Sequence, residues 1–452
     1  MKIVIIGAGP GGYETALHAA KRGVEVTLVE SGLPGGTCLN EGCIPTKAFC
    51  RNANMLDELS AAASFGISDL DYKFDFRSVK LRKDAVVGQL RSGVESLLEH
   101  KMIDFVRGKA YFKDMHTVCV DSPEGVKEFT GDYVIIATGS VSASLPVPGA
   151  ELPQVLTSRE MLDLEEVPRR LCVIGGGVIG LEMASVFRSF GSEVTVLEYA
   201  KDILPRFDQD LARRLKQLLS KRGIVINNQA EVKSIGQKAD SACEVVFVRK
   251  GKEESVVCDK VLMAVGRRAN TASLNLSDAG IAFDSRGICV NEFMQTNIPH
   301  IYAVGDVNGL MMLAHAAVFQ GMVALDHIMG IKNGIDLSVM PSAVFTSPEA
   351  ASVGMTEEEC KASGMPVKCL KSFFRANGKA VAMGETDGYC KLIVADDQSG
   401  RILGCHLVGP HSADIVHEAC AMITRGASLD DMRCVIHAHP TLSEVLQNAV
   451  HA

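Results

Sequence analysis

Short apolar runs alternate with helix-like stretches along most of the chain. The run KIVII at residues 2–6 ends in a glycine turn, is followed by the helical pattern TALHAAKR, and leads to the alternating, β-branched stretch VEVTLVE. The same order recurs from LCVI at residues 171–174, through LEMASVFRSF, to EVTVLE. Strand, turn, helix and strand in this order predict a βαβ unit with parallel strands. We therefore expect an α/β protein with two such units.

Each unit carries the same glycine signature between its first strand and its helix. The pattern Gly-x-Gly-x-x-Gly is formed by Gly7, Gly9 and Gly12 in the first copy and by Gly175, Gly177 and Gly180 in the second, and the following strands end at Glu30 and Glu198. Glycines permit a tight turn and close approach of a pyrophosphate to the helix N-terminus, and the acid binds a ribose. Both copies place the acid 23 positions after the first glycine (30 − 7 and 198 − 175). Two dinucleotide sites are predicted, and the alternative is that one copy is a decayed duplicate.

Composition narrows the class of protein. A length of 452 residues predicts about three domains, and 47% hydrophobic with 22% charged residues is typical of a soluble globular protein. The net charge of −8 argues against nucleic acid or an anionic membrane as a partner. The 14 cysteines include no Cys-x-x-Cys pair, so we expect no metal centre and a reducing compartment. Because Met1 leads straight into a strand and no transmembrane run follows, the prediction is a cytoplasmic protein.

The candidate chemistry lies in the segment GGTCLNEGCIPTK at residues 35–47. Cys38 and Cys43 stand five positions apart, and Lys47 adds a positive charge. Two thiols this close in sequence can form a local disulfide that opens and closes without unfolding the protein. A structural disulfide or two buried thiols are the alternatives. The nucleotide signature fewer than 40 residues earlier favours a redox role.

This segment resembles the redox-active disulfide of the flavin-dependent pyridine nucleotide–disulfide oxidoreductases. The resemblance covers the whole chain and includes the segment HAHPTLSE at residues 437–444. It implies two Rossmann-like domains, the first for FAD and the second for NAD, and a C-terminal α+β dimerisation domain. The expected limits are 1–144 for the first part of the FAD domain, 145–269 for the NAD domain, 270–335 for the return to the FAD domain, and 336–452 for the dimerisation domain.

The resemblance also implies further cofactor contacts. For FAD these are Gly36, Thr37, Lys47, Ala110, Thr138, Gly139, Asp306, Ala314 and His315, and for NAD they are Glu182, Val232 and Gly266. His315 lies in a predicted helix at residues 311–321, for which a plain buried helix is the alternative. Glu198 is expected to select NAD over NADP, because its carboxylate would repel a 2′-phosphate and no arginine follows it.

Six residues are expected to carry the reaction. In the family pattern Cys38 is the interchange thiol, Cys43 is the flavin-facing thiol, and Lys47 near the flavin pairs with Glu182. His439 matches the acid–base and Glu444 the carboxylate that holds its ring. In the family this histidine comes from the other subunit, which implies a homodimer. The alternative is that His437 and His439 bind a metal or cap a surface turn.

The implied activity is oxidation of a protein-bound dihydrolipoyl group with reduction of NAD⁺. The implied partners are lipoyl domains of 2-oxoacid dehydrogenase complexes or the carrier protein of glycine cleavage. A glutathione-type reductase is the alternative, although it would favour NADPH and need substrate-binding arginines; a non-enzymatic NAD-sensing protein is a more distant one. Glu41 stands where the family usually has an apolar residue, and its charge is expected to lower the disulfide potential by about 10–30 mV.

Overall fold

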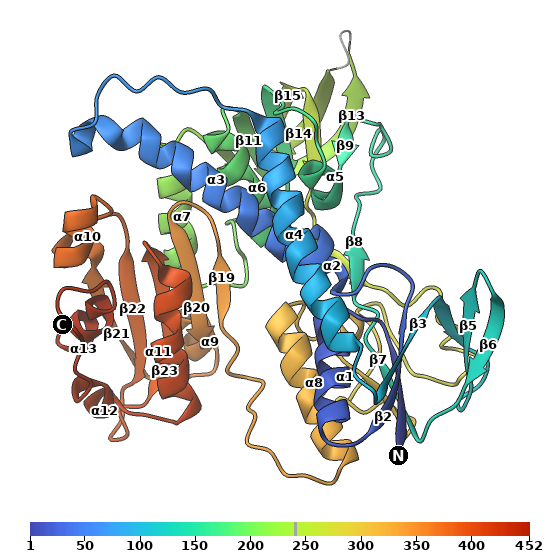
Figure 1. Cartoon of the computed structure of the whole chain (residues 1–452). Coiled ribbons are helices and arrows are strands. Elements are labelled where there is room, and N and C mark those ends of the chain that lie inside the picture. The colour runs from blue at the N-terminus through green and yellow to red at the C-terminus, as the bar shows by residue number, and fades with distance from the viewer. Residues whose placement is uncertain (239–241) are drawn as a thin grey trace. The chain divides into compact units, whose positions relative to one another are not determined.

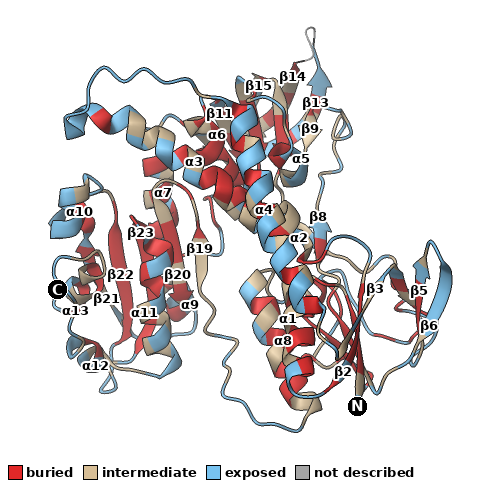
Figure 2. Ribbon diagram, viewed as in Figure 1, coloured by how far each residue is buried: buried red, intermediate tan, exposed pale blue. Residues whose placement is uncertain are grey.

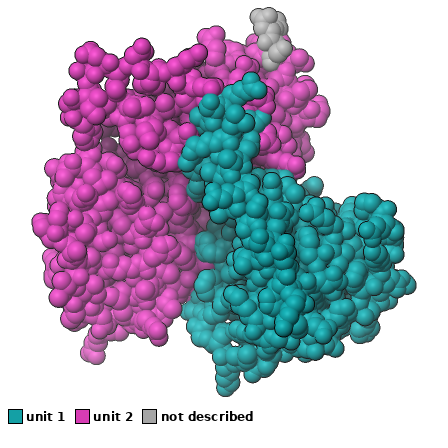
Figure 3. All heavy atoms as spheres, viewed as in Figure 1, with its two compact units in different colours: residues 1–48, 77–143, 266–337 teal, residues 49–76, 144–265, 338–452 magenta. Residues whose placement is uncertain are grey.

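The structure is a computed structural model that describes residues 1–238 and 242–452. The chain forms two compact units (Figure 3). The first contains residues 1–48, 77–143 and 266–337, and the second contains residues 49–76, 144–265 and 338–452. The chain passes between the units several times, so each unit is assembled from separate segments.

A five-stranded parallel sheet organises the first unit. Its order is β18–β7–β1–β2–β3, with β1 at Lys2–Ile6, β2 at Glu25–Glu30, β3 at Ile103–Arg107, β7 at Tyr133–Ile136 and β18 at Ile301–Ala303. Helices α1 (Pro10–Lys21) and α8 (Ala314–Ile328) lie side by side against it (Figure 1). Side chains alternate along a strand, so Ile3 and Ile5 enter one core cluster while Val4 and Ile6 enter another. Both faces of the sheet are therefore buried.

The first unit also contains two smaller sheets and short helical segments. The antiparallel sheet β4–β5–β6 consists of Lys109–Phe112, Val118–Ser122 and Gly125–Phe129, and strands β8 (Ser140–Ser142) and β17 (Arg267–Ala269) pair with each other. Two short helical segments are α2 (Gly36–Glu41) and η3 (Gly305–Asn308). Helix α4 (Phe76–Leu98) belongs to the first unit from residue 77 on; helix α3 (Cys43–Ala61) has residues 43–48 in the first unit and the rest in the second, which also contains the 3₁₀ turn η1 (Ala62–Phe65).

The second unit repeats the same plan. Its parallel sheet has the order β12–β11–β10–β16–β9, with β9 at Val155–Leu156, β10 at Arg170–Ile174, β11 at Glu193–Glu198, β12 at Val225–Asn228 and β16 at Lys260–Met263. Helices α5 (Ser158–Leu162), α6 (Val178–Ser189) and α7 (Gln209–Lys221) belong to it, as does the antiparallel sheet β13 (Ala230–Gln237), β14 (Cys243–Arg249) and β15 (Lys252–Cys258). The repeat predicted from two glycine turns thus extends to the sheets.

The C-terminal part of the second unit is an α+β layer, as predicted. Its antiparallel sheet has the order β19–β20–β23–β22–β21, formed by Ser342–Val344, Glu349–Gly354, Ile402–Gly409, Tyr389–Ala395 and Val367–Phe373. The helical elements are α9 (Glu357–Ala362), η4 (Phe374–Ala376), α10 (Gly378–Met383), α11 (Ser412–Thr424), α12 (Leu429–Arg433) and α13 (Glu444–Val450). Figure 2 shows the central strands β22 and β23 buried along their length.

One element begins later than the sequence predicts. The helix expected at residues 311–321 starts at Ala314, with Leu313 in extended geometry at its N-cap, and continues to Ile328. Residues 311–313 are apolar and therefore resemble the helix that follows them, although they belong to the preceding loop. Hydrophobicity alone does not locate a helix start when the preceding loop is also apolar.

We predict that Gly180→Ala lowers the free energy of unfolding by about 1–3 kcal/mol, the usual effect of overpacking. A Cβ at this position would lie 2.0 Å from the carbonyl oxygen of Gly175, so α6 could not approach β10 as closely. The control is Gly177→Ala, whose Cβ would meet no atom of the described residues within 4 Å. Thermal unfolding followed by circular dichroism measures both. Equal midpoints for the two variants would contradict the steric argument.

Candidate active site

The two glycine turns are closed by the carboxylates that end the second strand of each repeat. In the first copy the Glu30 carboxylate accepts hydrogen bonds from the backbone N–H groups of Ala8 and Gly32, both at 2.7 Å. In the second copy the Glu198 carboxylate accepts from Gly176 at 2.5 Å and Ala200 at 2.6 Å. Oε1 of Glu30 also accepts from the Ser31 hydroxyl at 3.4 Å, whereas Oε2 keeps a lone pair that a ribose hydroxyl could use.

The last glycine of each turn is needed because the start of the helix packs so closely against the first glycine that no side chain fits between them. A Cβ on Gly12 would lie 1.8 Å from the carbonyl oxygen of Gly7, the counterpart of the Gly180–Gly175 contact in the second copy. Gly177 faces open space among the described residues, so the first turn of α6 is accessible. The N–H groups and the partial positive charge of a helix N-terminus bind phosphate. Both turns therefore fit the pyrophosphate of a dinucleotide.

The cysteine segment is held directly against the first turn. The N–H of Gly35 donates to the carbonyl oxygen of Ala8 at 2.8 Å, and a Cβ on Gly36 would lie 2.6 Å from Cα of Gly9. Gly36 begins α2, and the predicted contact Thr37 is an exposed residue in its first turn. Any group bound at the first turn is therefore next to the start of the segment that carries both thiols.

The thiols of Cys38 and Cys43 are in hydrogen-bond contact. Cys38 is on α2, and Cys43 is the first residue of α3, where a helix N-terminus stabilises negative charge. The hydrogen bond with Cys43 and burial raise the pKa of Cys38, and the positive charge of Lys47 opposes that shift. Cys38 is therefore harder to deprotonate than an ordinary thiol. Glu41 is the half-buried last residue of α2, between the two thiols in sequence, and its effect on their potential stays a prediction.

Asp306 lies in η3 and is fixed by two residues that sequence reasoning did not single out. Its carboxylate accepts a hydrogen bond from the hydroxyl of Ser140 and forms an ion pair with Arg267 at 3.9 Å. Arg267 also donates to the Ser140 hydroxyl at 2.7 Å and to its carbonyl oxygen at 2.8 Å. The negative charge of Asp306 also contributes to the raised pKa of Cys38. The acid proposed for the flavin ribityl chain and the thiol pair therefore belong to one electrostatic environment.

Other predicted FAD contacts lie in loops and element ends of the first unit. Thr138 donates its hydroxyl to the carbonyl oxygen of Asn270 at 2.8 Å, and the carbonyl oxygen of Gly139 accepts from the N–H of Asn270 at 2.9 Å. The N–H of Gly108, two residues before Ala110, donates to the Glu30 carbonyl oxygen at 3.0 Å. Ala110 itself is buried on β4, and Ala314 and His315 begin α8.

The predicted NAD contacts are placed on the second repeat and on the segment that leaves it. Glu182 is buried on α6, where its carboxylate accepts the N–H of Phe345 at 2.9 Å. Val232 lies on β13, and Gly266 precedes β17 with φ of +117°, a left-handed conformation that favours glycine. Lys47 belongs to the first unit and Glu182 to the second. Their pairing therefore stays a prediction.

The C-terminal histidine and glutamate lie together, as the sequence predicts. Nδ1 of His439 is 2.9 Å from Oε1 of Glu444, and the N–H of Thr441 donates to Oε2 at 2.8 Å. The Thr441 N–H and the His439 ring both lower the pKa of Glu444. The carboxylate is thus ionised and holds the imidazole of His439 at Nδ1. The rest of the ring is exposed, and its Nε2 can take up a proton.

His437 has a role that the sequence did not reveal. Its Nε2 is 3.0 Å from Oε1 of Glu418 on α11, and its side chain is buried. Among the described residues there is no group of three or more His, Cys, Asp or Glu side chains placed to hold a metal ion. In the described part of the chain, no helix is long and apolar enough to cross a membrane.

Two dinucleotide-type turns and a thiol pair anchored to the first of them define an enzyme that exchanges electrons between a dithiol and dinucleotides. Residues 1–321 match the pyridine nucleotide-disulphide oxidoreductase model, and residues 340–450 match the dimerisation domain of the same family. The chain belongs to this family. The predicted family, fold class and cofactors, FAD and NAD, are thereby confirmed.

Similar proteins of known name span the whole chain. It is 38% identical to the dihydrolipoyl dehydrogenase of Geobacillus stearothermophilus, with 99% of this chain and 94% of the relative covered. It is 40% identical to the enzyme of that name from Chlamydia muridarum, over 98% of this chain and 94% of the relative. Among solved structures, the HOCl-induced flavoprotein disulfide reductase RclA of Escherichia coli, in a Cu(II) complex, matches with a TM-score of 0.89 at 32% identity over 100% of this chain and 98% of that one. LpdA of Mycobacterium tuberculosis matches with a TM-score of 0.92 at 25% identity over 100% and 99%.

We predict that Glu198→Arg lowers kcat/KM for NADH by about 10–100-fold, because a charge-assisted hydrogen bond contributes roughly 1.5–3 kcal/mol. The new positive charge should at the same time improve the use of NADPH, whose 2′-phosphate the wild-type carboxylate repels. The control is Glu193→Arg, which places the same charge at the exposed start of β11. Steady-state kinetics with both nucleotides measure the preference. An unchanged preference for NADH in Glu198→Arg would place the selectivity elsewhere.

Proposed function

We propose that this protein is a dihydrolipoyl dehydrogenase, which oxidises a protein-bound dihydrolipoyl group and reduces NAD⁺. The observation that carries the proposal is the contact between Cys38 and Cys43 on a segment anchored to the first glycine turn. The curated relatives named dihydrolipoyl dehydrogenase, at 38–40% identity over nearly the whole chain, support the choice within the family. Glu198 in the second repeat supports NAD as the acceptor.

In the proposed reaction one thiol of the substrate attacks the sulfur of Cys38 in the Cys38–Cys43 disulfide. A mixed disulfide with Cys38 forms, the Cys38–Cys43 bond breaks, and Cys43 leaves as a thiolate at the N-terminus of α3. The second substrate thiol then displaces Cys38, and the substrate leaves as its cyclic disulfide. His439 accepts the proton of the attacking thiol while Glu444 holds its ring. Two electrons and two protons have then moved from the substrate to the enzyme or its solvent.

When bound, FAD supplies two-electron transfer between the thiol pair and the nicotinamide. In the first unit its pyrophosphate is assigned to the turn at Gly7–Gly12, its adenosine ribose to Glu30 and its ribityl chain to Asp306. The turn at Gly175–Gly180 and Glu198 are assigned to NAD. Lys47 and Glu182 are proposed to form an ion pair at the reacting end of the flavin, as the family pattern implies.

We further propose that the protein acts as a homodimer, in which His439 serves the cysteine pair of the other subunit. The match of residues 340–450 to a dimerisation domain supports this arrangement. The proposed partners are lipoyl domains of 2-oxoacid dehydrogenase complexes or the glycine cleavage carrier protein. A cytoplasmic location is part of the proposal and rests on the cysteine usage of the sequence.

A reductase that runs in the opposite direction is the second candidate. The likeness to RclA, at 32% identity over the whole chain, favours it. Such an enzyme would pass electrons from NADH through the same thiols to an oxidant. The two candidates differ in whether NAD⁺ is reduced efficiently by dihydrolipoamide or NADH is consumed efficiently by Cu(II).

We predict that Cys43→Ser abolishes the long-wavelength charge-transfer absorbance that mild reduction of the holoenzyme should produce. The reason is that a serine hydroxyl does not ionise near neutral pH and cannot replace the donor thiolate. The control is Cys289→Ser, which changes an exposed cysteine of the same unit. Absorbance spectra during stepwise reduction measure the band. A band that persists in Cys43→Ser would show that Cys43 is not the flavin-facing sulfur.

We predict that His439→Ala slows dihydrolipoamide turnover by about 10²–10⁴-fold, the usual loss for a general acid–base. Flavin reduction by NADH should be retained, because that half-reaction does not need the substrate proton to be removed. The control is His116→Ala, at an exposed histidine of the first unit. Rapid-mixing spectroscopy measures the two half-reactions separately. An equal loss in both would point to misfolding and contradict the assigned role.

A further inference from the structure

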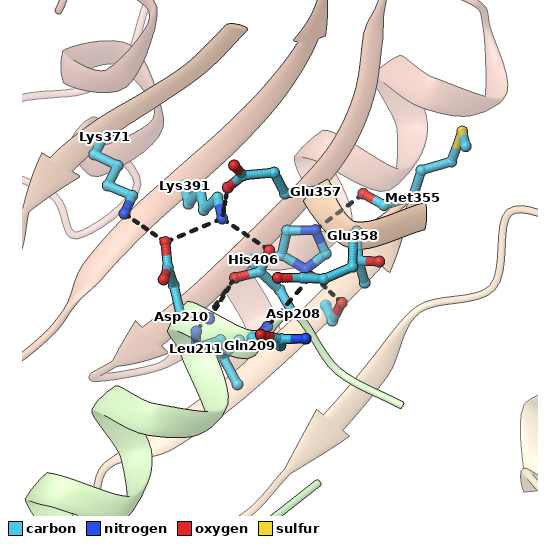
Figure 4. Close-up of polar contacts among 12 residues, drawn as sticks. Asp208, Gln209, Asp210, Leu211, Met355, Glu357, Glu358, Lys371, Lys391 and His406 are labelled. Atoms are coloured by element: carbon cyan, nitrogen blue, oxygen red, sulfur yellow. Dashed lines mark hydrogen bonds and ion pairs between the residues drawn. The ribbon is translucent and has the colours of Figure 1, made fainter. Parts of the chain in front are cut away.

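A fully buried lysine lies far from the thiol pair in sequence and takes no part in the mechanism. Lys391 is on the central strand β22, and its side chain has no exposed surface. Its ammonium contacts Asp208 at 2.8 Å, Asp210 at 3.2 Å and Glu357 at 2.6 Å (Figure 4). Burial lowers the pKa of Lys391, but the hydrogen bonds with Asp208 and Glu357 outweigh this and raise it above its usual value. The lysine is therefore charged.

The carboxylates that surround Lys391 come from different elements. Asp208 is buried at the N-cap of α7, where it accepts hydrogen bonds from the N–H groups of Asp210 and Leu211. Glu357 begins α9, and hydrogen bonds from Lys361 and Lys391 lower its pKa to about 2. Lys391 thus joins α7 of the second repeat to β22 and α9 of the α+β layer.

The loop that leads to Asp208 is also part of the second dinucleotide site. Residues 199–207 connect Glu198 to Asp208, and the N–H of Leu204 in this loop donates to the carbonyl oxygen of Gly176 at 3.0 Å. Ile203 is fully buried, and a Cβ on Gly176 would lie 3.0 Å from its Cγ2 atom. The loop therefore supports the Gly176 turn at one end and is held by Lys391 at the other.

Packing alone does not require charges at this place, provided that the lysine and its carboxylate partners are all replaced together. Replacing buried ion pairs by apolar side chains is often neutral for stability, whereas their best-attested use is to fix the register of packed elements. Here the ion pair fixes the position of the start of α7, and the loop before this helix donates a hydrogen bond to the carbonyl oxygen of Gly176. We propose that Lys391 is a positioning residue for NAD(H), because it holds Asp208 and so fixes the loop that supports the Gly176 turn and Glu198.

This inference rests on the proposed function of the second repeat as the NAD site. The test is Lys391→Met in the holoenzyme, with flavin reduction by NADH measured by rapid mixing over a range of NADH concentrations. We expect the Kd for NADH to rise by about 3–30-fold, the usual range for a residue that acts through others, with a smaller change in the limiting rate. Reduction of the enzyme by dihydrolipoamide should be unchanged, because that half-reaction needs no nicotinamide.

The matched control is Lys371→Met. Lys371 contacts Asp210 at 2.8 Å from the neighbouring strand β21, but it is partly exposed, and its contact is with Asp210 and not with the N-cap Asp208. The Kd of the Lys371→Met variant for NADH should equal that of the wild type. Equal Kd values for wild type, Lys371→Met and a folded, flavin-loaded Lys391→Met would overturn the proposal and leave a purely structural role. If NADH does not reduce the flavin of the wild-type protein, the proposed function itself is refuted.

If Lys391→Met does not fold, the variant Asp208→Asn tests the positioning role instead. Asparagine caps a helix about as well as aspartate, so α7 should form, while the charge that ties this N-cap to Lys391 is lost and Asp210 and Glu357 still pair with the lysine. A Kd for NADH raised by about 3-fold or more, with dihydrolipoamide reduction unchanged, would support the positioning role. A Kd equal to that of the wild type would overturn it.

Discussion

Both glycine turns depend on one interaction, the hydrogen bond from a backbone N–H of the turn to the carboxylate that ends the second strand of the repeat. Glu30 and Glu198 each accept two backbone N–H groups, one from the glycine turn and one from the residue two positions further on. The bonds from Ala8 and Gly176 tie each turn to the neighbouring strand, and the bonds from Gly32 and Ala200 hold the carboxylate itself in place. The remaining lone pairs are free for a ribose. A single side chain therefore shapes the turn and is also the one proposed to bind the ribose.

The thiol chemistry is built onto the first of these turns. The Gly35–Ala8 hydrogen bond and the contact between Gly36 and Gly9 hold the cysteine segment in place, and the helix break at Gly42 puts Cys38 and Cys43 on different helices. Their sulfurs can meet because α2 ends before α3 begins. The raised pKa of Cys38 distinguishes it from Cys43, whose place at the N-terminus of α3 favours negative charge. This division is what a dithiol oxidation needs.

The repeat, the α+β layer and the His439–Glu444 pair could be predicted from sequence because they depend on local patterns. Apolar runs with glycine turns indicate strands and helices, and a five-residue step lets Glu444 reach His439. The Ser140–Arg267–Asp306 group could not be found in this way, because 127 positions separate Ser140 from Arg267 and 166 separate it from Asp306. The role of Lys391 could not be predicted either. A single lysine in an apolar strand indicates a solvent-facing position, and only the tertiary structure brings Asp208 next to it.

The most direct test of the account is the reaction of the purified holoenzyme with a matrix of substrates. NAD⁺ and NADP⁺ are each supplied with dihydrolipoamide, NADH and NADPH are each supplied with oxidised glutathione or Cu(II), and kcat/KM is measured for every pair. The account predicts that dihydrolipoamide with NAD⁺ gives the highest value, and that it exceeds the value with NADP⁺ by at least about 10-fold, since a charge-assisted bond to the ribose is worth roughly that factor or more. A higher value for NADPH with glutathione, or for NADH with Cu(II), would contradict it.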